Sequence, residues 1–375
     1  MLLKNGCVFT EEGKFQKLDV RIREGKIAEM GENLSANGDE IRDLNGKRLL
    51  PGFLDIHTHG CGGCDFCDGT KDSFQTMADT YLKAGVTTVL GTSMTLPVEE
   101  LHNIFSAYRE FADHQTRGAR MIGINMEGPF ISVAKKGAHI GEYVIPADFD
   151  AFQKLNEASG NRIRQVDVAP EVPGNLDFIR KASKICTVCV AHTAGGYEST
   201  MAAYEAGATN NTHLYNAMSG FAHREPGVVG AVFDSNTFAE LICDGFHIHP
   251  AVIRSTFKIL GEDRICLISD SLRAAGCPNG TYELGGQQVF VKDGKATLEN
   301  GTIAGSVIDI RIAVQRAIRF GVREEAALKA ATINPARAIH MEEQIGSIAP
   351  GKLADLLIAD PDYNLQAVYL EGVLQ

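Results

Sequence analysis

Two histidines separated by one residue, His57 and His59, stand at the end of an apolar stretch and could bind a metal ion. The preceding residues 53–56 have the apolar character of a buried strand, and residues i and i+2 of a strand point to the same face. Two neutral imidazoles on one face can bind one cation, and zinc is among the metals that use such ligands. The pair taken alone is equally well explained as two unrelated histidines in a loop.

Four more polar residues stand at the ends of segments that we expect to be strands: Glu127, His192, His213 and Asp270. Each has an ordinary structural explanation, such as a hydrogen-bonded histidine or, for Asp270, the N-cap of a helix. Histidines and carboxylates together suit Zn²⁺, Fe²⁺ or Mn²⁺, and such an ion lowers the pKa of bound water and polarises a carbonyl group. Asp270 is then the candidate base that removes a proton from that water.

The elements that must position these residues alternate between apolar strand-like runs and helix-length segments from residue 52 onward. Eight runs are expected to be strands: 53–59, 86–92, 121–127, 163–169, 186–192, 207–213, 239–244 and 265–270. Most of the segments between and after them are expected to be helices: 71–84, 97–112, 146–157, 173–184, 197–206, 249–261, 308–320 and 324–333. This alternation indicates an α/β protein with a parallel sheet, and eight units predict a (β/α)8 TIM-like barrel. A doubly wound open sheet is the alternative.

A barrel would explain why the polar residues follow strands. The carboxyl ends of all barrel strands meet at one face, which is where active sites lie in this fold. The six polar residues would converge there from the ends of five strands. Buried charge is costly unless it is paired or bound to a metal, so this shared position favours a metal site over separate structural roles.

The two ends of the chain differ in type from the middle. Residues 1–50 and 342–375 read as short β segments joined by turns, and we expect them to pair into one small β-sandwich module. Residues 51–341 would then form the catalytic barrel, with a β-hairpin insertion near 281–302. Asp293-Gly294 is a strong signal for the turn of such a hairpin.

Charge and composition limit the classes of partner. The 375 residues carry 36 basic and 47 acidic side chains, a net charge of −11, which argues against nucleic acid and anionic membranes as partners. An anionic substrate would need a local group of positive side chains. We find no signal peptide and no apolar run of about 18 residues, so we expect no membrane span. The nine cysteines are an odd number and several lie in apolar runs, which favours reduced thiols in the cytoplasm.

A family resemblance rests on several motifs together. Residues 51–60, Pro-Gly-Phe-Leu-Asp-Ile-His-Thr-His-Gly, resemble the first-strand motif of the amidohydrolase superfamily. The segments 126–130, 136–139, 212–218, 244–247 and 269–271 are similar to motifs of the N-acetylglucosamine-6-phosphate deacetylase family. The similarity continues to residues 350–355 and so covers essentially the whole chain. It implies metal-dependent hydrolysis of N-acetyl-D-glucosamine 6-phosphate to D-glucosamine 6-phosphate and acetate, in amino-sugar catabolism.

One feature separates this family from other amidohydrolases. Many of them bridge two metal ions with a carbamylated lysine at the end of the fourth strand. Residues 168–171 here are Val-Ala-Pro-Glu and contain no lysine. The resemblance assigns the corresponding carboxylate to Glu127, which argues against a dihydroorotase-like or hydantoinase-like activity.

The resemblance also implies a role for each metal ligand. Glu127, His192 and His213 would hold the principal divalent ion, with zinc expected first and iron or manganese as alternatives. His57 and His59 would hold a second ion, although the enterobacterial form of the family lacks both histidines and works with one metal. Asp270 would act twice, first as base toward the attacking water and then as acid toward the leaving amine.

Substrate contacts are implied in the same way. His139 would donate a hydrogen bond to the acetyl oxygen, although without the resemblance it reads as an ordinary loop histidine. Asn216, the Ala217 backbone and His247 would bind the sugar phosphate. Arg224 would reach the phosphate in a neighbouring subunit, which implies a homodimer. From sequence alone, Arg224 is a cation in a surface loop.

The sequence leaves open two alternative functions and the role of one cysteine motif. A deacetylase for the galactosamine epimer would show the same motifs, because none of them reads the hydroxyl group that differs. A non-catalytic sugar-phosphate sensor would be expected to lack a ligand or Asp270, and the chain retains all of them. Cys61, Cys64 and Cys67 have the spacing of a thiolate site, but no fourth ligand follows, which favours a small-residue loop.

Overall fold

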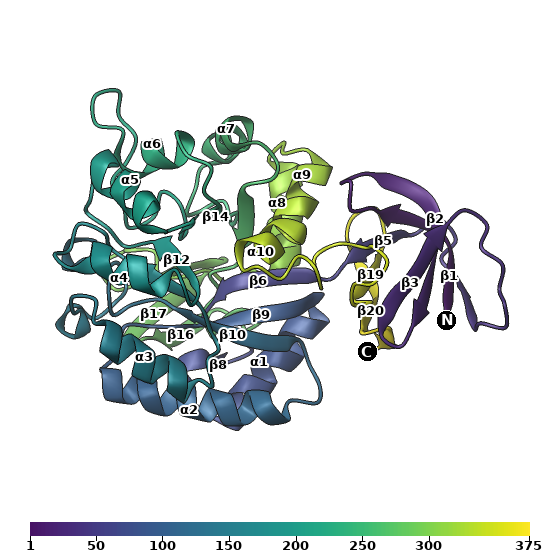
Figure 1. Cartoon of the computed structure of the whole chain (residues 1–375), viewed down its shortest axis with the longest axis horizontal. Coiled ribbons are helices and arrows are strands. Elements are labelled where there is room, and N and C mark those ends of the chain that lie inside the picture. Colours follow the sequence, from purple (N-terminus) through teal and green to yellow (C-terminus); the bar gives the residue numbers. More distant parts are fainter.

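Buried apolar strands alternate with helices from residue 53 onward, as Figure 1 shows for the larger part of the molecule. The computed structural model describes residues 1–375. Eight parallel strands run through this part: β6 (Phe53–Thr58), β9 (Val86–Ser93), β10 (Arg120–Met126), β11 (Ile163–Val168), β12 (Thr187–Val190), β13 (Asn210–Asn211), β14 (Ala239–Ile242) and β15 (Ile265–Ile268). All eight lie within the runs that the sequence predicts to be strands, apart from the last residue of β9 and the first residue of β10.

The eight strands form two parallel sheets that are hydrogen-bonded to each other at both sides. Strands β13-β12-β11-β10-β9-β6 form one sheet, and β14 pairs with β15 in the other. Between β13 and β14, the amide of Phe238 donates to the Thr209 carbonyl at 2.9 Å. Between β15 and β6, the amide of Asp270 donates to the His57 carbonyl at 3.0 Å. The arrangement is therefore of the TIM-barrel type, with the carboxyl ends of the strands on one side.

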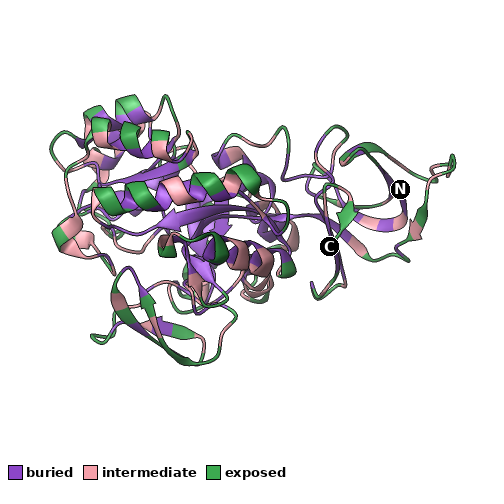
Figure 2. Cartoon of the chain, turned by 90° about the horizontal axis from the view of Figure 1, so that it is seen from below, coloured by how far each residue is buried: buried purple, intermediate pink, exposed green.

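Helices surround these strands and keep their polar faces toward solvent, so the strands are buried and the helices are partly exposed (Figure 2). The helices are α1 (Lys71–Lys83), α2 (Val98–His114), α3 (Phe149–Ala158), α4 (Asn175–Ala182), α5 (Tyr197–Ala206), α6 (Gly227–Phe233), α7 (Pro250–Leu260), α8 (Ile310–Arg319), α9 (Glu324–Ala330) and α10 (Ile333–Ala338). Apolar side chains of strands and helices form one core of 66 buried residues. No helix is both long and apolar enough to cross a membrane.

Two features of the helices differ from the sequence prediction. The segment 324–333 was expected to be one helix, but it is divided into α9 and α10 at Ala331 and Thr332. Pro335 explains the division, because proline has no amide hydrogen for the bond that would continue α9. Helix α6 was not predicted, since its run of buried valine, glycine and alanine has no polar face.

The smaller part contains both termini and is built from the two ends of the chain (Figure 1). Its strands are β1 (Leu2–Phe9), β2 (Phe15–Arg23), β3 (Lys26–Gly31), β4 (Ile41–Asp43), β5 (Arg48–Pro51), β19 (Leu356–Ala359), β20 (Leu365–Leu370) and β21 (Val373–Leu374). All eight belong to one sheet, in which β5 pairs antiparallel with β19. The sheet has its own core of 13 buried residues. Only Gly52 separates β5 from the first barrel strand β6.

The insertion contains one strand more than a single hairpin. Strands β16 (Gly280–Leu284), β17 (Gln287–Lys292) and β18 (Lys295–Thr297) form an antiparallel sheet with two tight turns. Asp293 and Gly294, which the sequence singles out, form the second turn with positive φ angles of 53° and 78°. Gly285 and Gly286 form the first turn, also with positive φ angles. Both turns match the two-residue type that the twist of a hairpin favours.

Short elements complete the side of the molecule where the strands end. A small hairpin directly follows β6 and consists of β7 (Gly60–Cys61) and β8 (Cys64–Asp65). Three single-turn helices follow in connecting loops: η1 (Phe66–Asp68), η2 (Val133–Lys135) and η3 (Gly141–Tyr143). Gln287 of the insertion donates a hydrogen bond to the Ala138 carbonyl. The insertion therefore contacts the loop that carries His139.

Candidate active site

The residues that the sequence singles out as metal ligands lie together at the carboxyl ends of the strands. His57 lies within β6 and His59 just beyond it, while Glu127 directly follows β10. His192 and His213 each stand two residues after a strand, β12 and β13. Both have left-handed φ angles, 42° and 29°, a conformation that costs free energy in residues other than glycine and that clusters at functional sites.

Glu127, His192 and His213 form the first group of side chains that could hold an ion. Glu127 Oε1 lies 3.0 Å from Nε2 of both histidines, and these two nitrogen atoms are 3.1 Å apart. His192 Nδ1 donates to the Lys135 carbonyl at 2.8 Å, so a neutral His192 has its free lone pair on Nε2. Such a hydrogen bond behind a ligand is typical of metal-binding histidines.

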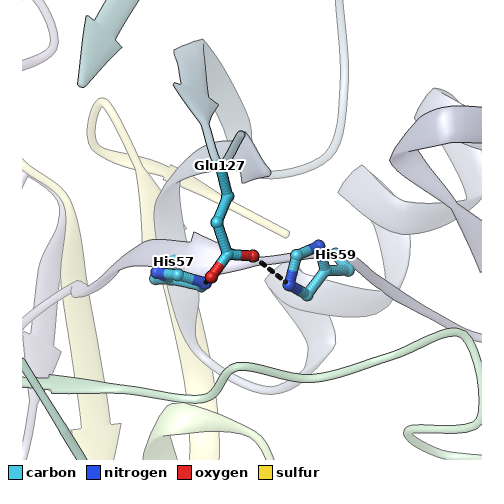
Figure 3. A group of neighbouring side chains, drawn as sticks. All are labelled: His57, His59 and Glu127. Atoms are coloured by element: carbon cyan, nitrogen blue, oxygen red, sulfur yellow. Dashed lines mark ion pairs between the residues drawn. The ribbon is translucent and has the colours of Figure 1, made fainter. Parts of the chain in front are cut away.

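His57, His59 and Glu127 form the second group, and Figure 3 shows the carboxylate of Glu127 between the two imidazoles. Glu127 Oε2 lies 3.2 Å from His59 Nε2, and Oε1 lies 3.5 Å from His57 Nε2. Glu127 is therefore common to both groups. All five residues are at least 95% buried, and water competes poorly for such positions.

Asp270 faces the second group from the end of β15. Its Oδ1 lies 3.3 Å from His59 Nε2 and 3.7 Å from His57 Nε2. Burial opposes ionisation of this carboxyl group, but the hydrogen bond from His59 and the charges of His57 and His59 lower its pKa to about 2. Asp270 is therefore a carboxylate at neutral pH, which is the form that a base requires.

The electrostatics of the cluster favour a cation. Burial opposes a positive charge on His57, yet Glu127 and Glu240 raise its pKa well above the ordinary value. Burial also opposes a positive charge on His59, yet the hydrogen bonds with Asp270 and Glu127 raise the pKa of His59 to about 10. His57 Nε2 is buried with no hydrogen-bond partner. A divalent ion would supply the positive charge and the missing partner, so the side chains fit the metal that the resemblance implies.

His139 is buried beside the first group, with Nε2 3.5 Å from Glu127 Oε2. The backbone amide of Thr95 donates to His139 Nδ1 at 3.1 Å. Because Nδ1 accepts, the neutral ring carries its hydrogen on Nε2, the atom that faces the cluster. Burial lowers the pKa of His139 to about 4, so the ring is neutral at physiological pH. His139 can therefore donate a hydrogen bond to an oxygen atom placed near the cluster.

A pocket of about 430 Å³ opens onto this cluster. Residues predicted from sequence that line it are His59, Glu127, His139, His192, His213, Asn216, Ala217, His247 and Asp270. His57 lies behind them and is fully buried. Arg224 does not line this pocket but lies in a second one, which it shares with Phe221 and Tyr197. Within one chain, the structure thus brings together every predicted site residue except Arg224.

Hydrogen bonds fix the side chains of His247 and Asn216 in the pocket, and the backbone of Ala217 has an unusual conformation there. His247 Nδ1 lies 2.7 Å from Asp244 Oδ2, and the Asn216 side chain donates to the His213 carbonyl at 3.1 Å. Burial opposes a positive charge on His247, but the hydrogen bond with Asp244 raises its pKa. Ala217 has a left-handed φ angle of 51°. These three residues could present N–H groups to an anion.

Sequence reasoning missed several residues around the site. Lys135, Leu284 and the loop 302–305 line the pocket but carry no motif that could have revealed them. Glu240 lies in the barrel interior and contacts His57. A signal for Glu240 was present in the sequence, because it is a single charge inside the apolar run Ala-Glu-Leu-Ile of 239–242.

This fold and this site define a metal-dependent hydrolase that acts on carbon–nitrogen bonds. The chain belongs to the Amidohydrolase family, whose profile matches residues 48–374. Within that family, it is 33% identical to the N-acetylglucosamine-6-phosphate deacetylase of Lysinibacillus sphaericus, over 99% of this chain and 97% of the relative. It is also 33% identical to the N-acetylgalactosamine-6-phosphate deacetylase of Escherichia coli O157:H7, over 100% of this chain and 98% of the relative.

Solved structures of N-acetylglucosamine-6-phosphate deacetylases superimpose on the whole chain. The N-acetylglucosamine-6-phosphate deacetylase of Pasteurella multocida has a TM-score of 0.94 and 30% identity, with 100% of this chain and 99% of that chain covered. A mutant of the Mycobacterium smegmatis enzyme in complex with N-acetyl-D-glucosamine-6-phosphate has a TM-score of 0.93 and 30% identity, with 100% and 98% covered. The resemblance inferred from the motifs is confirmed.

Proposed function

We propose that this chain hydrolyses N-acetyl-D-glucosamine 6-phosphate to D-glucosamine 6-phosphate and acetate, as a step of amino-sugar catabolism. The observation that carries the proposal is the position of Asp270. It is a buried carboxylate 3.3 Å from His59, and it lines the same pocket as His139 and the ligand group of Glu127. Base, hydrogen-bond donor and metal ligands therefore surround one space in which an acetamido group can react.

Glu127, His192 and His213 hold the principal ion in this proposal, and His57 and His59 hold a second. Zinc is the first expectation, because histidine nitrogen and carboxylate oxygen atoms are ligands that it favours, and iron or manganese are alternatives. The ion supplies a Lewis acid that polarises the acetyl carbonyl and makes water more acidic. All the ligands come from strand ends, so their positions are fixed by the barrel.

Asp270 and His139 carry out the proton transfer and the charge stabilisation. The Asp270 carboxylate accepts a proton from the attacking water and passes it to the amine nitrogen as the carbon–nitrogen bond breaks. His139 donates from Nε2 to the acetyl oxygen while negative charge develops on it. The amide hydrogen of Thr95 at Nδ1 keeps the proton of His139 on Nε2.

Asn216, Ala217 and His247 bind the sugar phosphate from within the same chain. His247 supports this role because Asp244 favours its positively charged form, which attracts phosphate. Arg224 would complete the site from a neighbouring subunit of a homodimer, since it lies outside the pocket of its own chain. Arginine suits phosphate because its planar guanidinium group can form two parallel hydrogen bonds.

The galactosamine epimer is a second candidate substrate. The Escherichia coli relative that carries that name has the same 33% identity as the Lysinibacillus sphaericus relative, so identity does not separate the two substrates. Acetate release from both 6-phosphates, measured together with the metal content of the protein, tests the proposal. We expect release from the glucosamine substrate with the higher kcat/KM. A preference for the galactosamine substrate would reverse the assignment, and no release from either would refute it.

The proposal extends to the organisation of the chain. We propose that residues 51–341 form a closed (β/α)8 catalytic barrel, and that 1–50 with 342–375 form a separate small β module; its strands share one sheet, in place of the two packed sheets of the expected β-sandwich. The hydrogen bonds between β15 and β6 and the separate 13-residue core support this division. We also propose that the protein works in the cytoplasm, which agrees with nine free cysteines.

A further inference from the structure

A buried carboxylate that the proposed reaction does not use, Glu240, contacts both groups of candidate ligands. It lies within β14 and is fully buried. Its Oε2 is 3.1 Å from His57 Nδ1 in the second group. The backbone amide of His213, in the first group, donates to the same oxygen atom at 3.4 Å. Glu240 therefore contacts the side chain of His57 in the second group and the backbone of His213 in the first.

Glu240 is itself held in place from a neighbouring part of the barrel. Gln165 of β11 donates from Nε2 to Glu240 Oε1 at 2.7 Å. With one oxygen bound to Gln165 and the other to His57, the carboxylate has little freedom to rotate. A charge inside an apolar strand is costly to bury, so it requires such compensating contacts.

The imidazole of His57 separates Glu240 from the position of an ion. Glu240 faces Nδ1, whereas Glu127 and Asp270 face Nε2 at 3.5 and 3.7 Å. The amide nitrogen of Asn125, Nδ2, is the other neighbour of His57 Nδ1, at 3.2 Å, while the amide oxygen of Asn125 is buried with no hydrogen-bond partner. If the Asn125 amide turns over, that oxygen becomes a second acceptor for the same N–H group. The surroundings of Nδ1 therefore favour a hydrogen on that atom.

We propose that Glu240 is a positioning residue that accepts the Nδ1–H of His57 and thereby directs the Nε2 lone pair toward an ion shared with His59 and Glu127. The inference rests on the ion that the proposed function assigns to His57 and His59. A carboxylate behind a ligand histidine fixes the tautomer and the orientation of the ring, and it strengthens the ligand. Removal of such a partner typically lowers metal affinity by roughly 10- to 100-fold.

Titration of the full-length, chelator-treated protein with Co²⁺ tests this role, with visible absorption and calorimetry as readouts. The variants are Glu240→Gln, which has the same shape and keeps a weaker acceptor, and Glu240→Leu, which has no acceptor. We expect wild type to bind two ions. Glu240→Gln should bind one of them about tenfold more weakly, and Glu240→Leu about a hundredfold more weakly. The other ion should bind to both variants as it does to wild type.

Asp167→Asn is the matched control, because Asp167 is an equally buried barrel carboxylate whose hydrogen bond comes from Thr212 at 2.9 Å. It should bind both ions with wild-type affinity, and the same loss in this control would overturn the inference. The inference would also be overturned if both Glu240 variants bound metal with unchanged affinity, or if they lost affinity for both ions equally. If Glu240→Leu does not fold, the metal affinity of the isosteric Glu240→Gln variant decides whether the inference holds.

Two outcomes separate this inference from the proposed function. Wild-type protein that binds a single ion would overturn the role of Glu240 and leave the proposed deacetylation intact. Wild-type protein that binds two ions but releases no acetate would refute the deacetylation, while selective loss of one ion in the Glu240 variants would still support the inference.

Discussion

Glu127 is the residue on which both groups of ligands depend. Its Oε1 contacts His192 and His213, and its Oε2 contacts His59. A shorter aspartate at this position could not keep its carboxylate within reach of histidines from β6, β12 and β13. Burial opposes ionisation of Glu127, but the charge of His57 and the hydrogen bonds from His139, His192 and His213 hold its pKa well below the ordinary value.

Asp270→Asn should remove most of the turnover while the metal content stays normal. Asparagine keeps the shape of the side chain but cannot accept a proton from water, and general acid–base groups typically contribute roughly 10²- to 10⁴-fold to rate. Acetate release and elemental analysis on the same preparation measure both quantities. Loss of the metal in this variant would instead make Asp270 a ligand. Exposed Asp263→Asn serves as control and should behave as wild type.

The double substitution His57→Gln with His59→Asn tests which of the two ligand groups holds the principal ion. If Glu127, His192 and His213 hold the principal ion, the variant should retain one ion and most of its activity. The measurement is metal content per chain together with kcat. A variant without metal would show that the histidine pair at the end of β6 is the principal site.

The strands, most helices and the position of the site could be predicted from the sequence, because long apolar runs are the strongest local signal. Strand β13 contains only two residues and its surroundings, Gly-Ala-Thr-Asn-Asn-Thr at 207–212, are not apolar, so His213 was identified from the alternation of strands and helices around it. Helix α6 and the contact of Glu240 with His57 could not be predicted in this way. The helix lacks a polar face, and the contact depends on residues 183 positions apart.

Of the three closely spaced cysteines, Cys61 and Cys64 lie in the hairpin of β7 and β8, and Cys67 lies in the single-turn helix η1 that follows it. Cys61 Sγ donates to the Met77 carbonyl at 3.7 Å, and Cys67 Sγ accepts from the Met94 amide at 3.2 Å. Burial raises the pKa of the Cys61 thiol to about 12, so it does not form the thiolate that binds metals.

Replacement of Cys61, Cys64 and Cys67 by serine should therefore leave metal content unchanged. Because Cys61 is buried, we expect a loss of stability of about 1–2 kcal/mol from the more polar hydroxyl group. Metal analysis and thermal unfolding of the triple variant check the two expectations. A loss of one ion per chain would identify the cysteines as ligands after all.

At the scale of the whole molecule, a substitution of Arg224 tests whether a second chain completes the site. Arg224→Ala should raise KM for the sugar phosphate by roughly 10- to 100-fold and change kcat little, because a hydrogen bond to a charged group contributes about 1.5–3 kcal/mol. Arg180→Ala is the control, since Arg180 is an exposed arginine on α4 that pairs with Asp177.

Mixed dimers make this test specific for a neighbouring subunit. A chain with Arg224→Ala retains Asp270, and a chain with Asp270→Asn retains Arg224. If arginine acts across the interface, mixing the two variants should restore sites with the wild-type KM, measured by acetate release. If Arg224 serves its own chain, the mixture should show only the high KM of the first variant.

The pairing of β5 with β19 has a consequence for how the protein is made. Residues 48–51 pair with β1 on one side, but they meet their other partner only when residues 356–359 have left the ribosome, some 300 positions later. Until then β5 has an open edge, and such edges invite pairing with other chains. Because Gly52 alone joins β5 to β6, the strand that leads to His57 and His59 starts beside this unfinished sheet. Strands β19, β20 and β21 thus complete a sheet whose other strands precede the whole barrel in the chain.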